Sequence, residues 1–287
     1  MAVGALLDAA LAGVLGLLVG SFLNVVIHRL PKMLERQWAA ECADSTGQPV
    51  NDEPRFNLMV PRSRCPHCGH GIRWYENIPV LSWLALRGRC SACKAPIALR
   101  YPVVELVTAG FFALCAARWG LTLQAAAWAA FAALLVCLFL IDMDTQLLPD
   151  DLNYSLLWLG LLVAALGWTV PLRSAVWGAA LGYLALWVVF QGYKLATGKE
   201  GMGYGDFKLL AALGAWLGAE YLLAIILLSS IVGAVIGVAL IVAGKLAHKD
   251  IPMPFGPYLA GAGLLCLALG PAALPALLPF AFPFGAH

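Results

Sequence analysis

The sequence predicts an all-α polytopic membrane protein with about eight transmembrane helices and one long polar loop. Its 287 residues are 62% hydrophobic and only 12% charged, and the mean hydropathy is +0.83. Soluble domains carry roughly twice that charged fraction. The apolar residues are gathered into long stretches, and only the interval 31–100 is both long and polar.

Eight apolar stretches are the candidate spans, and most approach the roughly 20 residues that cross a bilayer core. The stretch 207–219 is shorter, so it is either a tilted helix in a thinned region or one arm of a re-entrant hairpin. The first stretch lacks a basic segment before it, which favours a retained anchor over a signal peptide. The stretches cover residues 9–28, 101–118, 123–141, 152–170, 175–193, 207–219, 221–243 and 255–279.

The distribution of Lys and Arg predicts the orientation in the membrane. With the N-terminus outside and a full span at 207–219, 16 of the 18 basic residues lie on the cytoplasmic side. A re-entrant hairpin would move Lys245 and Lys249 outside, so the charge bias favours a full span. The cytoplasmic set is Arg29, Lys32, Arg36, Arg55, Arg62, Arg64, Arg73, Arg87, Arg89, Lys94, Arg100, Lys194, Lys199, Lys208, Lys245 and Lys249.

The chain is expected to have three parts. Residues 1–30 form the first transmembrane anchor, 31–100 a cytoplasmic module, and 101–287 the helical membrane domain. The first half of the module, to about residue 60, is expected to be loop with some helix. The small-xxx-small pair Gly233 and Gly237 is expected to serve helix packing.

Four cysteines predict a structural zinc site in the module. Cys65, Cys68, Cys90 and Cys93 form two C-x2-C pairs with 21 residues between them, the spacing of two zinc knuckles. Two disulfides or spare thiols are the alternative, which the reducing cytoplasm disfavours.

Four thiolates close the metal shell, so no position is open for water and the metal is expected to be structural. His67 and His70, beside the first pair, are expected to be bystanders. Cys42, Cys115, Cys137 and Cys266 have no partner spacing.

Two aspartate motifs predict acid–base chemistry at the membrane edge. Asp142 ends the third apolar stretch and Asp206 begins the sixth, so the predicted topology brings both to the cytoplasmic boundary. Carboxylates beside the hydrocarbon layer are costly and are presumed to be functional. Two carboxylates that share a site retain one proton between them, so one can activate water while the other polarises a carbonyl group.

Each aspartate also has a structural alternative. Asp144 competes with Asp142, but positions i and i+2 of a helix point about 200° apart, so the two do not form one pair. Asp206 could simply cap its helix, and Asp150 and Asp151 are expected to complement a helix N-terminus.

Several residues near the aspartates are also expected to have defined roles. Gly203 and Gly205 allow a close approach before Asp206. Lys208 is expected to be an interfacial anchor. The prolines around Phe255-Gly256 (Pro252, Pro254 and Pro257) stiffen the start of the last span, with a role in holding substrate left open.

These features together resemble the prepilin peptidases, or type IV leader peptidases, of bacteria over nearly the whole chain. The resemblance is carried by the cysteine tetrad and by residues 20–31 (GSFLNVVIHRLP), 76–79 (ENIP), 100–105 (RYPVVE), 141–150 (IDMDTQLLPD), 198–208 (GKEGMGYGDFK) and 254–257 (PFGP).

The resemblance implies a multi-pass aspartic peptidase of the GxGD type in the bacterial inner membrane. Such enzymes cut the leader from type IV prepilins and type II secretion pseudopilins at the cytoplasmic membrane face. The catalytic pair carries over to Asp142 and Asp206, with Gly203, Gly205 and Asp144 in support. The lipid bilayer and the membrane-embedded substrates are the expected partners, and no nucleic acid is expected.

Members with the cysteine-bearing loop also N-methylate the new N-terminal residue with S-adenosylmethionine, and all four cysteines are present here. No glycine-rich fingerprint marks the methyl-donor site, for which residues 31–100, including Gly88, are the candidate region.

Two other classes of protein remain as alternatives. A proton-coupled carrier explains carboxylates in a membrane but gives the cysteine module no role. A non-enzymatic scaffold of a secretion assembly would use the module as a docking surface.

Overall fold

The computed structural model describes residues 2–47, 54–199, 201–243, 254–270, 275–276 and 279–282. These residues are helical or irregular, and their only strand-like pairing is two isolated bridges in the polar loop. Five of the described helices are long and apolar enough to cross a membrane. The predicted class, an all-helical polytopic membrane protein, is therefore confirmed. The chain divides into two compact units, Met1–Ala129 and Ala130–His287.

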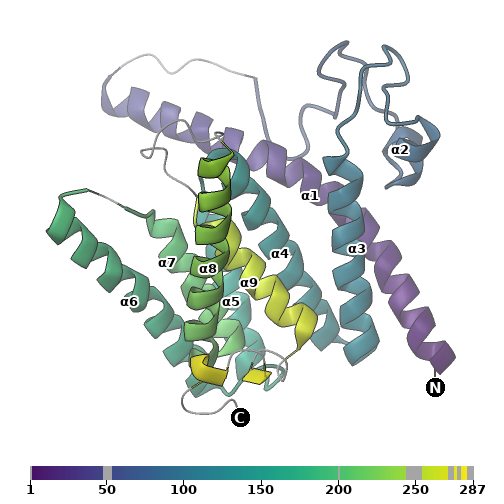
Figure 1. Ribbon diagram of the computed structural model, residues 1–287. Helices are drawn as coiled ribbons and strands as arrows, with labels where there is room; N and C mark the ends of the chain where they lie inside the picture. The colour runs from purple at the N-terminus through teal and green to yellow at the C-terminus, as the bar shows by residue number, and fades with distance from the viewer. Residues whose placement is uncertain are drawn as a thin grey trace. The chain divides into compact units, whose positions relative to one another are not determined.

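Every predicted apolar stretch contains a helix (Figure 1). Three of these helices, α5, α7 and α9, have only 16, 14 and 14 residues, fewer than a perpendicular span requires. The eight helices are α1 (Ala2–Ser45), α3 (Arg100–Trp119), α4 (Leu123–Thr145), α5 (Asp150–Ala165), α6 (Leu172–Thr197), α7 (Tyr204–Leu217), α8 (Leu222–Val242) and α9 (Gly256–Leu269).

Two boundaries differ from those expected. Helix α1 continues through Pro31 to Ser45, because residues 32–45 are rich in helix-forming Leu, Glu, Arg, Gln and Ala. The boundary proposed at residue 30 therefore falls inside a helix. Helix α9 ends at Leu269, where Gly270 adopts a positive φ of 85°. Lys245, Lys249 and Pro252 lie outside the described residues.

In the first unit, α1 and α3 pack side by side (Figure 1). Gly16 and Gly20 of α1 allow this approach, since a Cβ atom on either would lie 2.7 Å from the α3 backbone. Glu105, buried in α3, accepts a 2.7 Å hydrogen bond from the backbone N–H of Val80. That bond joins the polar module to the helix pair.

In the second unit, α7 is almost wholly enclosed by protein. From Leu209 to Leu217 every side chain is buried, against α5, α6, α8 and α9. The indole of Trp216 fits beside Gly160 of α5 and donates a 2.9 Å hydrogen bond to the Leu156 carbonyl group. A helix covered by protein does not have to match the bilayer thickness, which explains how a 14-residue helix is accommodated.

Glycines also bring α6 and α7 into backbone contact. A Cβ atom on Gly178 of α6 would overlap the Gly214 carbonyl oxygen of α7, and one on Gly182 would lie 2.7 Å from the Leu210 carbonyl oxygen. This close packing of small residues is typical of membrane helix pairs. Gly233 of α8 also packs at a helix contact, against the ring of Tyr258 in α9, as its small-xxx-small motif predicts.

We predict opposite effects from the same substitution at two glycines of α6. Gly178→Ala should lower the free energy of unfolding by about 1–3 kcal/mol, because the added methyl group overpacks the α6–α7 contact. Gly192→Ala, where nothing lies within 4 Å of the added carbon, should raise it by about 0.5–1 kcal/mol. Thermal unfolding of the purified variants in detergent measures both. Equal stability of the two variants would contradict the proposed contact.

Candidate active site and metal centre

Asp142 lies in the last turn of α4, in the second unit. Its side chain is 4% exposed, because the helix continues the apolar surface that buries Ile141. The backbone N–H of Gly256 donates a hydrogen bond to its carboxylate. Asp142 therefore faces the start of α9.

Asp206 lies in the first turn of α7 and is 6% exposed. The backbone N–H of Gly203, the N-cap residue, donates to its carboxylate. An acidic side chain in this position complements the positive end of the helix. Gly203 is the N-cap residue, so Asp206 does not cap the helix in the way that the sequence left open.

The two carboxylates are close enough to interact electrostatically. One oxygen of each, Oδ2 of Asp142 and Oδ1 of Asp206, is buried with no hydrogen-bond partner among the described residues. Buried polar atoms are almost always paired in folded proteins, so two unsatisfied oxygens on interacting acids make this pair the candidate active site. Such a pair can share a proton and act on a water molecule between its members.

Two glycines make room for this pair. A Cβ atom on Gly256 would meet Asp142 Oδ2 at 2.5 Å, and one on Gly205 would lie 2.7 Å from the side chain of Leu148. Gly205 therefore permits the close approach that the sequence predicts. Gly203 is different, since its extended backbone and open surroundings would accept a side chain.

Asp144 lies two residues beyond Asp142 and is exposed. The structure thus separates the two acids of the first motif, with only Asp142 turned into the protein beside Asp206.

Two further polar contacts of the site were not expected from the sequence. Lys208 Nζ forms a bidentate ion pair with Asp150, at 2.6 and 2.8 Å, which joins the first turns of α7 and α5. Asn153 of α5 is fully buried and donates a 3.4 Å hydrogen bond to the Leu148 carbonyl group. Sequence spacing gives no signal for the Lys208–Asp150 pair, because it joins two helices whose relative position only the folded chain defines. The Asn153 contact is local, five residues back along the chain.

The four cysteines form a second cluster, within the first unit. Their sulfur atoms all lie within 4.8 Å of one another. The Cys65 and Cys93 sulfurs are 3.8 Å apart, the separation that two ligands of a tetrahedral zinc with Zn–S bonds of about 2.3 Å have. A disulfide requires about 2.05 Å, and all four cysteines are free. The donor set therefore fits a zinc ion.

The two cysteine pairs have the same local structure. In the first, the Cys65 N–H donates to the His70 carbonyl group and the Gly69 N–H to that of Cys65. The second repeats these bonds 25 residues later, with Cys90, Lys94 and Ala95 in the equivalent places. Gly69 and Lys94 both adopt the left-handed conformation, with φ of 73° and 61°. The chain thus builds two equivalent knuckles.

Backbone N–H groups favour the metal-binding thiolate form of the first cysteine in each knuckle, although the pKa of the Cys68 thiol is raised to about 11. The backbone N–H groups of Cys68 and His67 donate to the Cys65 sulfur and lower the pKa of its thiol to about 7. Donation from Cys93 and Ala92 lowers the pKa of the Cys90 thiol in the same way.

The side chain of His70 contacts Glu76, which agrees with the expectation that it is not a metal ligand. Its Nε2 atom lies 3.2 Å from Oε2 of Glu76. The same carboxylate oxygen accepts a 2.8 Å hydrogen bond from the Arg73 backbone N–H. This bond, followed by bonds from the Ser91 hydroxyl and His70, lowers the pKa of Glu76 to about 2, so Glu76 is ionised at neutral pH.

Comparison with known proteins identifies two matching families. Residues 14–119 match the bacterial peptidase A24 N-terminal domain, and residues 105–238 match the type IV leader peptidase family. No solved structure matches the chain.

Curated relatives match the chain over most of its length. A prepilin leader peptidase/N-methyltransferase of Stutzerimonas stutzeri is 54% identical over 271 residues, which cover 93% of each chain. A protein of the same name from Aeromonas hydrophila is 56% identical over 264 residues, or 88% of each chain. One from Pseudomonas aeruginosa is 54% identical over 257 residues, or 89% of this chain and 88% of the relative. With this identity over so much of its length, the chain belongs to the type IV leader peptidase family.

Proposed function

We propose that the protein removes the leader peptide of type IV prepilins and pseudopilins and then N-methylates the new N-terminal residue. The main support for peptide cleavage is the pair of buried, interacting carboxylates of Asp142 and Asp206. Each has one oxygen atom without a hydrogen-bond partner among the described residues. The names of the curated relatives support both activities.

In peptide hydrolysis, the ionised aspartate accepts a proton from water while the water oxygen attacks the scissile carbonyl carbon. The protonated aspartate donates its proton to the carbonyl oxygen as the tetrahedral intermediate forms. The intermediate then collapses, the C–N bond breaks, and the leaving nitrogen takes a proton from the first aspartate. The second aspartate recovers its proton from a hydroxyl group of the intermediate, which leaves as the carboxylic acid. This cycle needs neither a metal nor a nucleophilic side chain.

In the second reaction, the amine nitrogen exposed by cleavage attacks a methyl carbon and then loses a proton. S-adenosylmethionine supplies that methyl group when it is bound, since its C–S bond breaks with the electron pair passing to sulfur. Cys65, Cys68, Cys90 and Cys93 would hold a zinc ion that cross-links the two knuckles and stabilises the module.

For the membrane arrangement, we propose eight crossings in the bacterial inner membrane with the N-terminus outside. The bias of Lys and Arg then places the dyad and the zinc module on the cytoplasmic side. Helices α5, α7 and α9 count as short crossings. Within this scheme, residues 1–30 act as the anchor, 31–100 as the zinc module and 101–287 as the peptidase domain.

We predict that Asp142→Asn and Asp206→Asn each lower the rate of leader cleavage by roughly 10²- to 10⁴-fold or more, because neither amide can exchange the proton. Mass spectrometry of a purified prepilin incubated with each variant measures the loss. Asp151→Asn, an exposed acid on α5, is the matched control and should cleave normally. Full cleavage by either dyad variant would exclude the mechanism and return the carrier and scaffold to consideration.

A second prediction concerns Gly256. Gly256→Ala should impair cleavage without unfolding the protein, because the added methyl group meets Asp142 Oδ2 and displaces it. Gly261→Ala in the same helix adds a methyl group at an ordinary contact distance of 3.7 Å from Phe139 and should be active. Cleavage rates and thermal unfolding of both variants test this, and equal activity would show that Asp142 does not depend on Gly256.

A third prediction concerns the metal. Cys65→Ser or Cys90→Ser should release zinc and reduce methyl transfer far more than cleavage, because the dyad lies outside the module. Elemental analysis and separate assays of the two activities measure this. Cys42→Ser, an exposed cysteine outside the cluster, should keep its zinc. Equal loss of both activities would argue against separable sites.

A further inference from the structure

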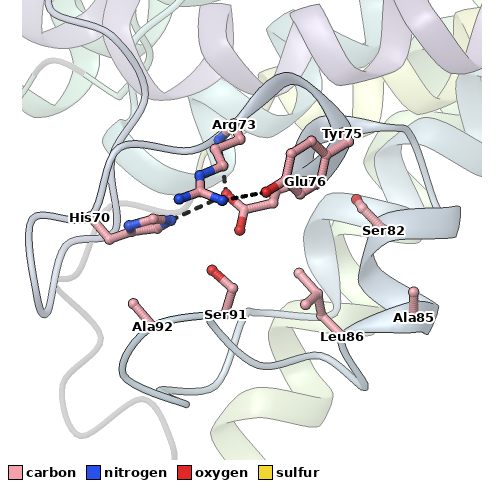
Figure 2. A pocket seen from close by; sticks show the side chains of 9 residues that line it. All are labelled: His70, Arg73, Tyr75, Glu76, Ser82, Ala85, Leu86, Ser91 and Ala92. Carbon is pink, nitrogen blue, oxygen red and sulfur yellow. Dashed lines mark hydrogen bonds and ion pairs between the residues drawn. The ribbon is translucent and has the colours of Figure 1, made fainter.

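A pocket of about 490 Å³ opens between the two knuckles of the zinc module (Figure 2). Its walls come from three segments: the stretch from His70 to the 3-10 helix Trp74–Asn77, the short helix α2 (Leu81–Ala85) and the turn of the second knuckle. The volume lies within the range of about 300–1,000 Å³ that is usual for small-molecule sites. No residue of the Asp142–Asp206 site lines it.

The pocket has a charged side and an apolar side. Figure 2 shows Arg73, Glu76 and His70 gathered along one wall, and Ala85 and Leu86 on the opposite side near the bottom of the view. The guanidinium group of Arg73 is fixed by a 2.6 Å hydrogen bond from Nη1 to the Tyr75 hydroxyl oxygen. Since Arg carries five N–H donors, others remain for a ligand.

Glu76 is a partly buried acid whose position is fixed by hydrogen bonds. Its side chain is 9% exposed, and it is held by the Arg73 backbone N–H and by His70. One carboxylate and one guanidinium at neighbouring positions suit a ligand with an ammonium group beside a carboxylate. An anion alone would face the charge of Glu76, and a cation alone would face that of Arg73.

We propose that this pocket binds the methyl donor S-adenosylmethionine, with Arg73 on the carboxylate and Glu76 on the ammonium of its amino-acid end. The apolar side formed by Ala85 and Leu86 then contacts the face of the adenine ring. This inference rests on the proposed methyl transfer.

The location explains why a structural metal accompanies methyl transfer. His70 follows the first knuckle and Ser91 lies within the second, so the pocket keeps its shape only while the knuckles are held together. Gly88, which the sequence suggested for this site, does not line the pocket. It has a positive φ of 66° and lies against the indole of Trp83, where it forms the turn into the second knuckle.

The test measures binding directly, on the full zinc-loaded chain in detergent, with S-adenosylhomocysteine as the titrated probe. Arg73→Ala should raise its Kd by roughly 10- to 100-fold, because a charged hydrogen-bond partner is removed. Ala85→Trp should block the pocket while removing no polar contact. Because Ala85 is exposed on α2, the larger side chain should not disturb the fold. Calorimetry gives Kd, and elemental analysis confirms that zinc is retained.

Each variant has a matched control in the same module. Arg62→Ala removes an exposed arginine that does not line the pocket, and Leu84→Trp adds the same indole at an exposed position of α2 outside it. Both should bind the probe like the unmodified protein.

The outcomes separate the two proposals. If the unmodified protein neither binds the probe nor methylates a cleaved pilin, the proposed methyl transfer fails. If it does both while Arg73→Ala and Ala85→Trp bind the probe normally, the pocket assignment is overturned. Normal probe binding combined with a raised KM for the pilin would instead assign the pocket to the methyl acceptor, which also contradicts the proposal.

Discussion

The burial of two carboxylates is the constraint on which the second unit depends. Asp142 and Asp206 are among the least exposed polar side chains in the described residues, and each keeps an oxygen without a hydrogen-bond partner. Removing charge from water is costly, so the protein tolerates such a pair only where surrounding structure fixes it. Backbone N–H groups from Gly203 and Gly256 provide part of that support.

The packing around α7 follows from this constraint. A short helix that carries an acid at its first turn can stay at the centre of the unit only if its neighbours come close. Glycines on α5 and α6 remove the side chains that would prevent this, and Trp216 fills the space left beside Gly160. The Lys208–Asp150 ion pair then joins α7 to α5 beside the acid. Rigid packing of this kind holds the two acids in place.

The first unit differs, since most large apolar side chains of its polar module remain exposed. Two equivalent knuckles, each closed by the same pair of backbone hydrogen bonds, bring four sulfurs together. A metal ion there can replace the missing core. Glu105 and Val80 attach the module to the α1–α3 pair, and Glu76 connects residues from both knuckles. The pocket between the knuckles is formed where these segments meet.

The sequence by itself determined the class of fold, the cysteine tetrad and both aspartate motifs, because hydropathy, ligand spacing and costly membrane carboxylates are local signals. The sequence could not predict that helix α1 continues beyond Pro31, because the helix-forming residues after Pro31 and the helix-breaking proline give opposite signals. Only the tertiary structure placed Gly256 against Asp142 and paired Lys208 with Asp150. Each of these depends on contacts between residues distant in the chain, which residue spacing along one segment does not encode.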